Sequence, residues 1–513
     1  MGSISLAIQR VFLFLSMVVN WIIALFSPDT RLHRARFANA SELRQLLCHT
    51  PASDGLLLGS RKSGFVTVRP TKTRRELGNL FVVAPTRGGK GLLATSQLLS
   101  WKHSVVVNDI KGELFTQTAG YRATLGNVYV IDPDGYGHRF DPLHGKQTED
   151  EFYSASSHLL FQADEGEGRI FTERATVMLT QLFLAARAER IAPFPYVRFL
   201  IRLGLSAAAA RLNTVEPSLA TQFLDTNFLK ANLADRFLAS CWGTLTARMR
   251  PLLTETVVRS LTHADFTPRE LLCGALPVSV YIRWKEQDLL ALSPLVRLLW
   301  GTLINGLTTT YDNKQGEGCR PVLLLIDEAG RTAIPMLADQ ATTVVGRGIS
   351  LWIAIQSLSQ LETVYGKARA QVLRDNMESQ IYYRPADLAT ADYLERRLGN
   401  TSAYAHSTTS RDGEETSEGL AERPIPLLAS QDISQLTDRE IIGFHRHLPP
   451  FRLDRCDWRN HPLLAQRRNI PAPELFKLPQ LADMPIRNTE GLNGFVDPDM
   501  IYEDKEREEA RLN

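Results

Sequence analysis

Seven short apolar segments rich in β-branched residues most restrict the folds that this chain can adopt. They are NLFVVA (79–84), SVVVND (104–109), NVYVID (127–132), VSVYIRW (278–284), VLLLIDEA (322–329), ISLWIAIQ (349–356) and SQIYYR (379–384). Nearly continuous apolar strands that alternate with helical patterns are typical of a parallel sheet covered by helices on both faces. We therefore predict an α/β fold built on a parallel sheet.

Length and composition set broad limits. A chain of 513 residues exceeds one ordinary hydrophobic core, so we expect two or more folded units. The net charge of +2 gives no general attraction to nucleic acid, so any DNA contact must be local. The five cysteines are scattered and none falls in a C-x-x-C pair, which disfavours a zinc site and a disulfide framework. A reducing compartment fits this pattern.

The amino terminus carries an apolar run. Residues 11–26 are apolar with two polar exceptions. At 1.5 Å per residue they span about 24 Å, somewhat less than the hydrocarbon core of a bilayer. Three arginines follow the run and favour a cytoplasmic location for the rest of the chain. We interpret residues 1–28 as a membrane anchor, with a cleaved signal peptide or a buried core helix as alternatives.

Residues 29–77 form a basic, turn-rich stretch that we interpret as a juxtamembrane connector. Basic residues beside an anchor most often face anionic lipid headgroups. Contact with a nucleic-acid backbone is the alternative, and the sequence alone favours neither decisively.

The stretch FVVAPTRGGKGLL, residues 81–93, has the outline of the phosphate-binding loop G-x-x-x-x-G-K-[ST]. Two positions depart from it. Ala84 replaces the first glycine, which is a mild change, and Gly91 replaces the hydroxyl residue that normally ligates Mg²⁺. Thr95 lies one helical turn further on, too deep to substitute for it. The candidate nucleotide contacts are Thr86, Arg87, Gly88, Gly89, Lys90 and Gly91. On the loop alone, a plain glycine-rich turn is an equal alternative.

Polar side chains end two of the predicted strands. Asp327 and Glu328 follow RPVLLLI, where an aspartate can hold Mg²⁺ and a glutamate can orient and deprotonate the attacking water. A helix cap is the structural alternative for this pair. Gln356 ends the next buried strand and can hydrogen-bond the γ-phosphate or water. The glycine-rich loop, the acidic pair and Gln356 occur along the chain in the order found in RecA-like motors. We therefore predict ATP and Mg²⁺ as cofactors.

Residues 151–268 interrupt the alternation of strands and helices. They contain runs such as ERATVMLTQLFLAARAER, with apolar residues at helical spacing and few strand signals. We interpret the last two thirds of this block as an inserted all-α domain. The polar segment 402–424 is predicted to be a mobile loop. The full division is a RecA-like nucleotide-binding domain over 78–185 and 266–464, an all-α domain over 186–265, and a partly disordered C-terminal extension over 465–513.

Several of these motifs together resemble the TraG-like coupling proteins of conjugation and type IV secretion. The resemblance covers about residues 55–464. It is carried by APTRGGKG (84–91), SVVVNDIKGELFTQTAGYR (104–122), VYVIDPDGYGHRFDPL (128–143), LLLIDEAG (323–330), GRGISLWIAIQSLSQLETVYG (346–366) and DLATADYLERRLGNTS (387–402). This family often has Lys-Gly without a hydroxyl at this point of the loop, so Gly91 fits the family pattern.

The resemblance implies a homohexameric ATPase anchored in the bacterial inner membrane, with most of the chain in the cytoplasm and an all-α domain at the cytoplasmic mouth. Its implied partners are a relaxase with single-stranded DNA, or effector proteins, and the inner-membrane components of the secretion system. The family usually has two membrane helices around a small periplasmic segment, whereas this sequence shows one short apolar run. Channel contacts made by the first helix are therefore not carried over.

The resemblance also implies residue roles. Lys90 binds the β- and γ-phosphates, Asp327 holds Mg²⁺, Glu328 activates water and Gln356 acts as a sensor. Arg347, in GRGIS, is a candidate arginine finger for a neighbouring subunit, and an ordinary surface arginine is its equal alternative. Asp109, Lys111 and Glu113 in NDIKGEL match a further family motif without an assigned step, and a helix cap is the alternative for Asp109.

Two other functions compete with a DNA-stimulated motor. A nucleotide-dependent docking receptor for cargo needs little turnover and no water-activating glutamate, so the Asp327-Glu328 pair disfavours it. A duplex translocase of chromosome segregation uses similar chemistry, but the long helical insertion disfavours it. The nature of the cargo, DNA or protein, is not encoded in any motif that we can interpret.

Overall fold

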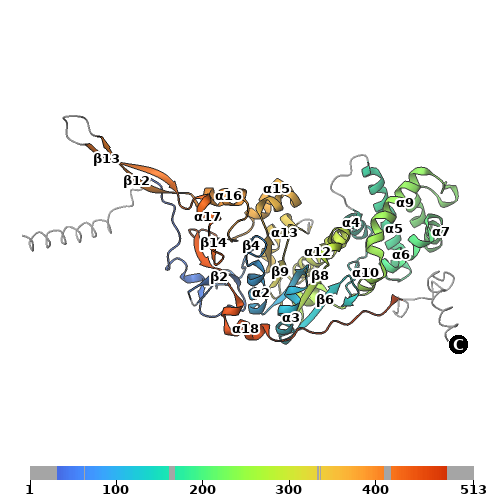
Figure 1. Ribbon diagram of the computed structural model, residues 1–513. Helices are drawn as coiled ribbons and strands as arrows, with labels where there is room; N and C mark the ends of the chain where they lie inside the picture. Colours follow the sequence, from blue (N-terminus) through green and yellow to red (C-terminus); the bar gives the residue numbers. More distant parts are fainter. Residues whose placement is uncertain are drawn as a thin grey trace, which may run out of the picture.

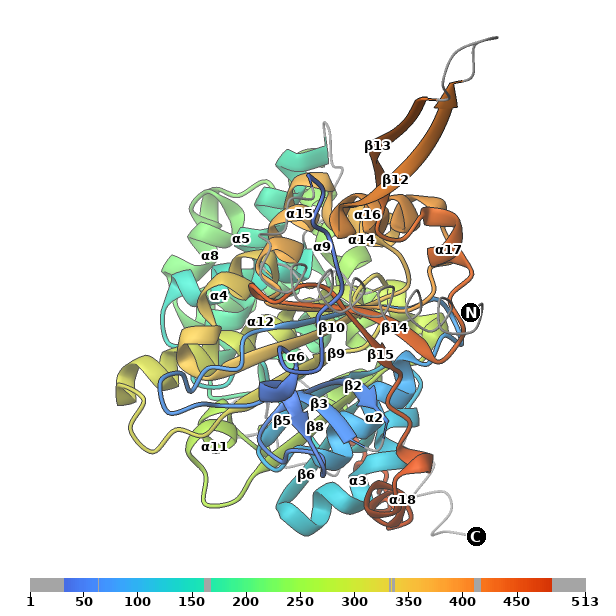
Figure 2. The same ribbon diagram turned by 90° about the vertical axis from the view of Figure 1, so that its left-hand side faces the viewer.

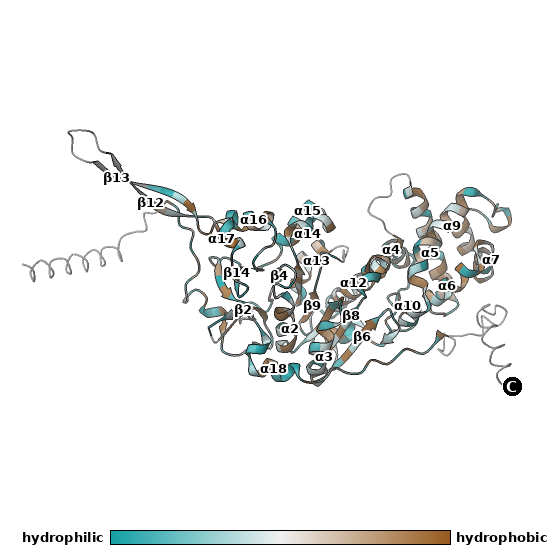
Figure 3. Cartoon of the chain, in the orientation of Figure 1, coloured by the Kyte–Doolittle hydropathy of each residue, from teal (hydrophilic) through white to brown (hydrophobic). Residues whose placement is uncertain are grey.

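The computed structural model describes residues 32–62, 64–160, 168–331, 334, 337–409 and 417–481. The predicted anchor (1–28) and the end of the predicted C-terminal extension (482–513) lie outside these residues. Figure 1 shows a central sheet, a group of helices at one end and a long hairpin projecting from the other end. Figure 3 shows how hydrophobic residues are distributed over these elements.

Seven parallel strands form the centre of the described sheet, and they are the seven segments that the sequence predicts. Each makes a parallel pair with its neighbour. Their order is β11 (Ser379–Tyr382), β4 (Leu80–Val83), β10 (Ile349–Ile355), β9 (Val322–Ile326), β5 (Ser104–Asp109), β8 (Val278–Arg283) and β6 (Asn127–Asp132). The predicted α/β class with a parallel sheet is thereby confirmed.

Antiparallel strands extend this sheet at both edges. Beyond β6 lies β7 (Tyr136–Gly137). Beyond β11 lie β14 (Glu440–His445), β15 (Phe451–Asp454), β2 (Leu56–Arg61), β3 (Gly64–Val68) and β1 (Leu47–Cys48).

Strands β1–β3 fall within 29–77, so this stretch differs from the turn-rich connector that the sequence suggests. Leu56, Leu57 and Leu58 are buried. The side chain of Gln97 also bonds the backbone here, accepting from Leu57 N at 2.7 Å and donating to Gly55 O at 3.0 Å. The surrounding charges obscure this short buried segment in the sequence.

Two hydrophobic cores cover the two faces of the sheet, because successive residues of each strand point to opposite faces. In β10, Leu351 and Ile353 belong to one core and Trp352 and Ala354 to the other. The second core includes α2 (Lys90–Ser100), α3 (Glu113–Leu125) and α18 (Pro462–Arg468). The first includes α11 (Pro268–Cys273), α12 (Leu289–Lys314), α13 (Leu337–Thr343), α14 (Leu358–Tyr365), α15 (Lys367–Asp375), α16 (Leu388–Leu398) and α17 (Ser430–Ser434).

Helix α12 is long and apolar enough by composition to cross a membrane, the one such helix among the described residues. Half of its most apolar window is buried against the rest of the protein. Its buried side chains, among them Trp300 and Leu303, belong to the first core. The structure therefore places α12 as a core helix along the sheet (Figure 1).

Between β7 and β8 the described residues form helices, turns and loops, with no strand among them. The α-helices that precede α11 here are α4 (Glu149–Leu160), α5 (Arg169–Ala188), α6 (Pro193–Leu203), α7 (Leu205–Val215), α8 (Pro217–Leu224), α9 (Arg236–Met249) and α10 (Glu255–Ser260). Helix α5 lies at their centre and packs against α4, α6, α8 and α9. The boundary suggested by the sequence between residues 185 and 186 falls inside α5. Figure 1 shows these helices gathered at the end opposite the hairpin.

Two long strands form where the sequence predicts a mobile loop. Strands β12 (Asn400–Thr409) and β13 (Ser417–Pro426) pair antiparallel along their whole length. The resulting hairpin projects from the body in both Figures 1 and 2. Its base is held by the amino-terminal segment, since Leu32 N donates to Glu422 at 2.7 Å and His33 N donates to Ser402 at 3.1 Å. The prediction failed because a hairpin that covers no core needs no apolar face, so its strands lack the alternation that marks a half-buried strand.

The chain after α18 crosses helix α3. A Cβ added at Gly120 would lie 2.1 Å from the carbonyl oxygen of Ile470, so glycine lets the two backbones approach. Further on, Leu478 N donates to Gly135 O at 2.7 Å and Gly137 N donates to Phe476 O at 2.9 Å. The beginning of the predicted C-terminal extension therefore lies against the α/β body.

Candidate functional site

The carboxyl ends of four neighbouring strands bring the predicted residues together. The order is β4, β10, β9 and β5, so β10 lies between the strand before the loop and the strand before Asp327. The carboxyl ends of parallel strands lie at one edge of a sheet, where ligands of α/β proteins bind. The loop, Gln356, the Asp327-Glu328 pair and Asp109 therefore meet at this edge.

The loop between β4 and α2 has a tight backbone. Gly88 N donates to Pro85 O at 2.9 Å, Arg87 has φ +63° and Gly89 has φ +108°. The value at Gly89 favours glycine, because a side chain there would be strained. Helix α2 begins at Lys90, and the first amides of a helix have no partner within the helix. Such amides and the helix dipole attract phosphate.

A chain of hydrogen bonds joins four of the predicted residues. Thr86 Oγ1 donates to Gln356 Oε1 at 3.3 Å, and Gln356 Nε2 donates to Glu328 Oε2 at 2.8 Å. The other carboxylate oxygen of Glu328 accepts from Lys90 Nζ. Lys90 Nζ also lies 3.5 Å from Asp327 Oδ1. The loop and the two strand ends are thus connected side chain to side chain.

The backbone directs two of these side chains. Glu328 has φ +63°, an uncommon conformation for a residue with a side chain and one that concentrates at functional sites. Gln356 N donates to Gln360 Oε1 at 3.1 Å. A Cβ at Gly330 would lie 2.2 Å from Gln360, so this glycine leaves room for the glutamine that holds Gln356.

The carboxyl groups of the site have different acidities. Burial raises the pKa of Asp327, although the charge of Lys90 opposes this. Burial also acts to raise the pKa of Glu328, but Lys90 and the hydrogen bond from Gln356 outweigh it and hold this pKa below the usual value. Burial raises the pKa of Asp109 to about 6, even though it accepts from Phe115 N at 2.7 Å and Leu114 N at 3.3 Å. Leu114 and Phe115 lie in the first turn of α3, so these two contacts fit the alternative role of Asp109 as a helix cap.

The residues present fit a magnesium ion. Asp327 Oδ1 is buried and accepts no hydrogen bond from any residue that the structure describes. Mg²⁺ prefers oxygen ligands of this kind. A Cβ at Gly91 would have no atom within 4 Å, so space is open where the usual hydroxyl would be. Thr95 is buried and its hydroxyl donates to Gln117 Oε1 at 3.0 Å, so it is engaged elsewhere.

A cavity of about 670 Å³ opens over these residues. This volume lies in the range of small-molecule sites. Its walls carry six cationic side chains and four carboxyl groups, an excess of positive charge that suits a phosphate ligand. The cations are Arg87, Lys90, Lys111, Arg331, Arg455 and Arg459, and the carboxyl groups are Asp109, Glu113, Asp327 and Glu328.

Three of these arginines were missed by the sequence reasoning. Arg331 follows the Asp327-Glu328 pair, and Arg455 and Arg459 come from the segment after β15. No motif marks Arg455 or Arg459, because only the position of β15 in the sheet brings this segment to the cavity. The basic cluster RNHPLLAQRR (459–468) was the nearest signal, but such a cluster does not show which part of the fold its side chains face.

Arg347 lies elsewhere. It ends a short helix (Val345–Arg347) before β10, whereas Gln356 follows the carboxyl end of the same strand. Seven strand residues separate the two ends by about 23 Å, at about 3.3 Å per residue. The guanidinium of Arg347 pairs with both carboxylate oxygens of Asp312 in α12, at 2.7 and 2.9 Å. The structure therefore does not bring Arg347 into the cavity of its own chain.

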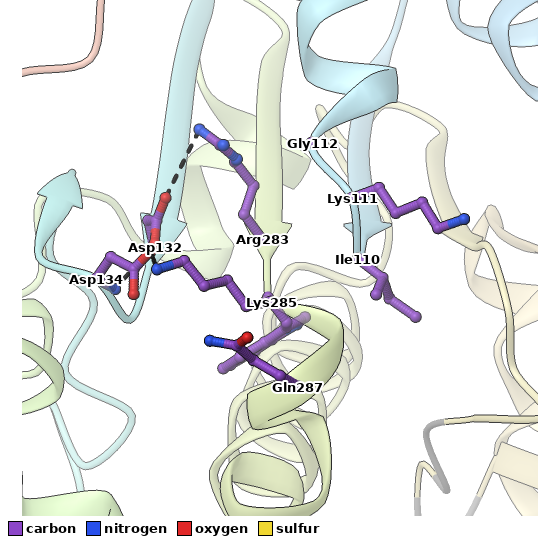
Figure 4. A pocket seen from close by; sticks show the side chains of 9 residues that line it. Ile110, Lys111, Gly112, Asp132, Asp134, Arg283, Lys285 and Gln287 are labelled. Carbon is purple, nitrogen blue, oxygen red and sulfur yellow. Dashed lines mark hydrogen bonds and ion pairs between the residues drawn. The ribbon is translucent and has the colours of Figure 1, made fainter.

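A second cavity, of about 610 Å³, adjoins the first at the carboxyl ends of β5, β6 and β8. The two cavities share Ile110 and Lys111. Figure 4 shows its ion pairs: Arg283 lies 3.6 Å from Asp132, and Lys285 lies 2.8 Å from Asp134. These pairs tie the ends of β6 and β8 to each other beside the candidate site.

The sequence matches one protein family over most of its length. Residues 38–480 match the family described as "Type IV secretory system Conjugative DNA transfer". The chain belongs to this family. The resemblance to TraG-like coupling proteins is thereby confirmed.

Relatives within the conjugative DNA transfer family include VirD4 and TraG. "Protein VirD4" of Rhizobium rhizogenes is 25% identical over 429 residues, which cover 80% of this chain and 63% of that protein. "Conjugal transfer protein TraG" of Escherichia coli is 26% identical over 384 residues, covering 64% of this chain and 56% of that protein. The chain thus spans about 60% of the length of these relatives.

Solved structures of the coupling protein TrwB share the fold. The unbound form of TrwBdeltaN70 superposes with a TM-score of 0.61 at 16% identity, covering 84% of this chain and 94% of that one. TrwB in complex with ADP and Mg²⁺ gives a TM-score of 0.58 at 16% identity, and the match covers 88% of this chain and 97% of that one. The mixed α/β fold with parallel strands is therefore common to both proteins.

Proposed function

We propose that this chain is a membrane-anchored ATPase that couples a transfer substrate to a type IV secretion channel, with ATP hydrolysis powering or gating the transfer. The observation that carries the proposal is the connection of Lys90, Glu328, Gln356 and Thr86 at the carboxyl edge of the sheet. The buried Asp327 adjoins them, with one carboxylate oxygen that accepts no hydrogen bond from the described residues, and a cationic cavity opens over them. TrwB, which shares the fold, is described in complex with ADP and Mg²⁺, which supports these cofactors.

Each residue has a role in this proposal. The loop residues Thr86, Arg87, Gly88, Gly89, Lys90 and Gly91 bind the phosphates. Asp327 holds Mg²⁺, which when bound polarises the phosphate oxygens. Glu328 orients the attacking water and accepts its proton, and Gln356 holds the water or the γ-phosphate in place.

Lys90 links nucleotide binding to the basicity of Glu328. Its charge holds the pKa of Glu328 low in the structure, and a carboxylate with a low pKa is a weak base. In this proposal Lys90 turns to the phosphates when the nucleotide binds, so Glu328 loses one of the partners that hold its pKa low.

The transfer substrate is relaxase-bound single-stranded DNA, an effector protein, or both. The family description and the names of the relatives support DNA transfer. In this proposal residues 1–28 anchor the chain in the inner membrane, where it meets the inner-membrane components of the secretion system. The helices over 186–265 form an all-α domain at the cytoplasmic mouth that receives the cargo.

A homohexameric ring completes the proposed site. Arg347 lies too far from its own cavity to reach it, so it could act only in a neighbouring subunit. Its pair with Asp312 also fits the alternative of an ordinary surface arginine. A ring also lets modest local charge line a channel for single-stranded DNA, which agrees with the net charge of +2.

ATP turnover by the full chain in detergent, without and with single-stranded DNA, tests the proposal. We expect turnover that rises with DNA and is lost in Lys90→Ala and Glu328→Gln. Lys102→Ala is the matched control, because the Lys102 side chain is exposed and its one ion pair with a described residue is with Asp54, at 4.0 Å. Tight ATP binding without turnover, unaffected by DNA, would replace the motor with a nucleotide-dependent docking receptor.

A further inference from the structure

We propose that Arg455 contacts the phosphates of the nucleotide bound by its own subunit. The proposal rests on the nucleotide site proposed above and adds to it a residue outside every motif of the loop and the strand ends. Arg455 follows β15. In the sheet, β14 and β11 lie between β15 and β4, the strand that leads into the glycine-rich loop. Its side chain nevertheless lines the cavity together with Gly89 and Lys90.

The side chain of Arg455 packs directly on the loop. A Cβ at Gly89 would lie 3.4 Å from Arg455 Cδ and 3.5 Å from Arg455 Nη1. The same position is 3.4 Å from the ring of Tyr383, which follows β11. Gly89 precedes Lys90, at the point of the loop where amides approach a phosphate most closely. The guanidinium of Arg455 is therefore within reach of an anion held by these amides.

Arg455 is also available to a ligand. Its guanidinium makes no hydrogen bond and no ion pair within 4 Å to any residue that the structure describes. The charge of Arg455 contributes to lowering the pKa of Asp457, but Arg459 already binds both oxygens of this carboxylate, at 2.8 and 2.5 Å. Arg331, another cation of the cavity, lies 3.8 Å from Glu328. A half-buried guanidinium without a carboxylate partner is suited to phosphate, which it can bind through two nitrogen atoms.

The backbone of Arg455 is held in place before any ligand arrives. Arg455 N donates to Arg439 O at 2.6 Å. Ser60 Oγ, at the end of β2, donates to Arg455 O at 3.1 Å and to Asp454 O at 3.3 Å. These bonds come from β2 and from the residue before β14, so a phosphate bound by Arg455 connects the nucleotide to the antiparallel edge of the sheet. With the backbone already held, ligand binding has to order only the side chain, which lowers the total entropy lost on binding.

Equilibrium binding of a fluorescent ATP analogue with Mg²⁺ to the full chain in detergent tests the inference. We expect Arg455→Gln to weaken binding about tenfold or more, as for the loss of a hydrogen bond to a charged group. Arg455→Lys should retain part of the affinity, because lysine keeps the charge and loses the paired geometry. Arg439→Gln is the matched control, since Arg439 is exposed and does not line the cavity.

A thermal unfolding series separates binding from folding. We expect Arg455→Gln to melt like the wild type without nucleotide, and to lose most of the increase in melting temperature that ATP produces in the wild type. If Arg455→Gln fails to fold, a folded Arg455→Lys with intermediate affinity still supports the contact. Unchanged binding in Arg455→Gln would overturn the inference. The inference would also be overturned if both Arg455 variants lost affinity to the same extent and both melted at a lower temperature without nucleotide. Arg455 would then be a residue that packs against Tyr383 and Gly89.

Lys90→Ala distinguishes failure of this inference from failure of the proposed function. If Lys90→Ala abolishes binding and Arg455→Gln leaves it intact, the site is right and the role of Arg455 is wrong. If Lys90→Ala binds the analogue like the wild type, the nucleotide lies elsewhere and both proposals fall.

Discussion

Lys90, the first residue of α2, is hydrogen-bonded to Glu328, which comes just after β9. Strand β10 lies between β9 and β4, the strand that leads to Lys90. The same ammonium group lies 3.5 Å from Asp327. In this structure Lys90, the cation proposed for the phosphates, is thus paired with the two carboxylates proposed for Mg²⁺ and water. Nucleotide binding must exchange these contacts for contacts with the ligand, and this exchange is the basis of the first two predictions.

Replacing Lys90 with alanine removes the cation that bonds Glu328 in the structure and that we propose binds the phosphates. We expect ATP binding to weaken about 10- to 100-fold, the range for loss of a charge-assisted hydrogen bond. Titration with a fluorescent ATP analogue measures this, with Lys102→Ala as the control. Wild-type affinity in Lys90→Ala would mean that the loop does not hold the phosphates.

Replacing Glu328 with glutamine separates chemistry from binding. Turnover should fall about 10²- to 10⁴-fold, because the proposed general base is lost. ATP affinity should stay the same or increase, because the carboxylate of Glu328 no longer competes with the phosphates for Lys90. Single-turnover hydrolysis and equilibrium binding on the same preparation measure the two effects. Equal loss of both would contradict the assigned role.

A hydroxyl at position 91 should support magnesium binding. A Cβ at Gly91 meets no atom within 4 Å, so Gly91→Ser fits without rearrangement. We expect the Mg²⁺ concentration for half-maximal turnover to fall in Gly91→Ser and to stay unchanged in Gly91→Ala, the matched control. Serine can supply the ligand that Mg²⁺ takes from many phosphate-binding loops, and alanine cannot. An identical Mg²⁺ dependence in both variants would show that the ion does not approach this position.

Mixing two inactive variants tests whether Arg347 serves a neighbouring subunit. Arg347→Ala should lower turnover about 10³-fold or more if Arg347 is an arginine finger. In a ring formed from Arg347→Ala and Glu328→Gln subunits, some sites combine an intact Glu328 with an intact Arg347 of the next subunit. We expect turnover to reappear in this mixture and not in either variant alone. Full activity of Arg347→Ala would instead identify Arg347 as a surface partner of Asp312, because exposed ion pairs contribute little to stability.

Acid should destabilise the fold partly through His445. This side chain is buried between β14 and β11, where it bonds Ser379 at 2.8 Å, and burial lowers its pKa to about 4. The unfolded chain therefore binds more protons than the folded one between about pH 6.5 and 4. The contribution of His445 to stability is present above this window and is lost as the pH falls through it.

His445→Gln removes this titration while keeping a polar side chain at the position. The melting temperature should fall less steeply between pH 6.5 and 4 in the variant than in the wild type. The difference in free energy of unfolding across the window should be about 2–3 kcal/mol, since each pKa unit corresponds to about 1.4 kcal/mol. Parallel pH profiles for the two proteins would show that His445 is not the titrating group.

The sequence by itself determined the seven central strands and the residues that end them. A strand buried on both faces must be apolar along its whole length, and the polar residue that ends it marks the edge of the sheet. Lys90, Asp327, Glu328 and Gln356 could therefore be selected from local patterns, and family resemblance reinforced the choice. Such patterns do not show the order of the strands, because any strand buried on both faces resembles the next.

Only the tertiary structure decided the rest. The leucines of β2 become recognisable as a strand once α2 and β15 lie beside them, and β12 and β13 pair without any apolar face to indicate them. Arg455 reaches the loop because β14 and β15 fold back beside β11, far from the loop in sequence. A local pattern records the solvent exposure and backbone preference of a segment. Which distant segments meet depends on sheet order and long-range packing, and these belong to the folded chain as a whole.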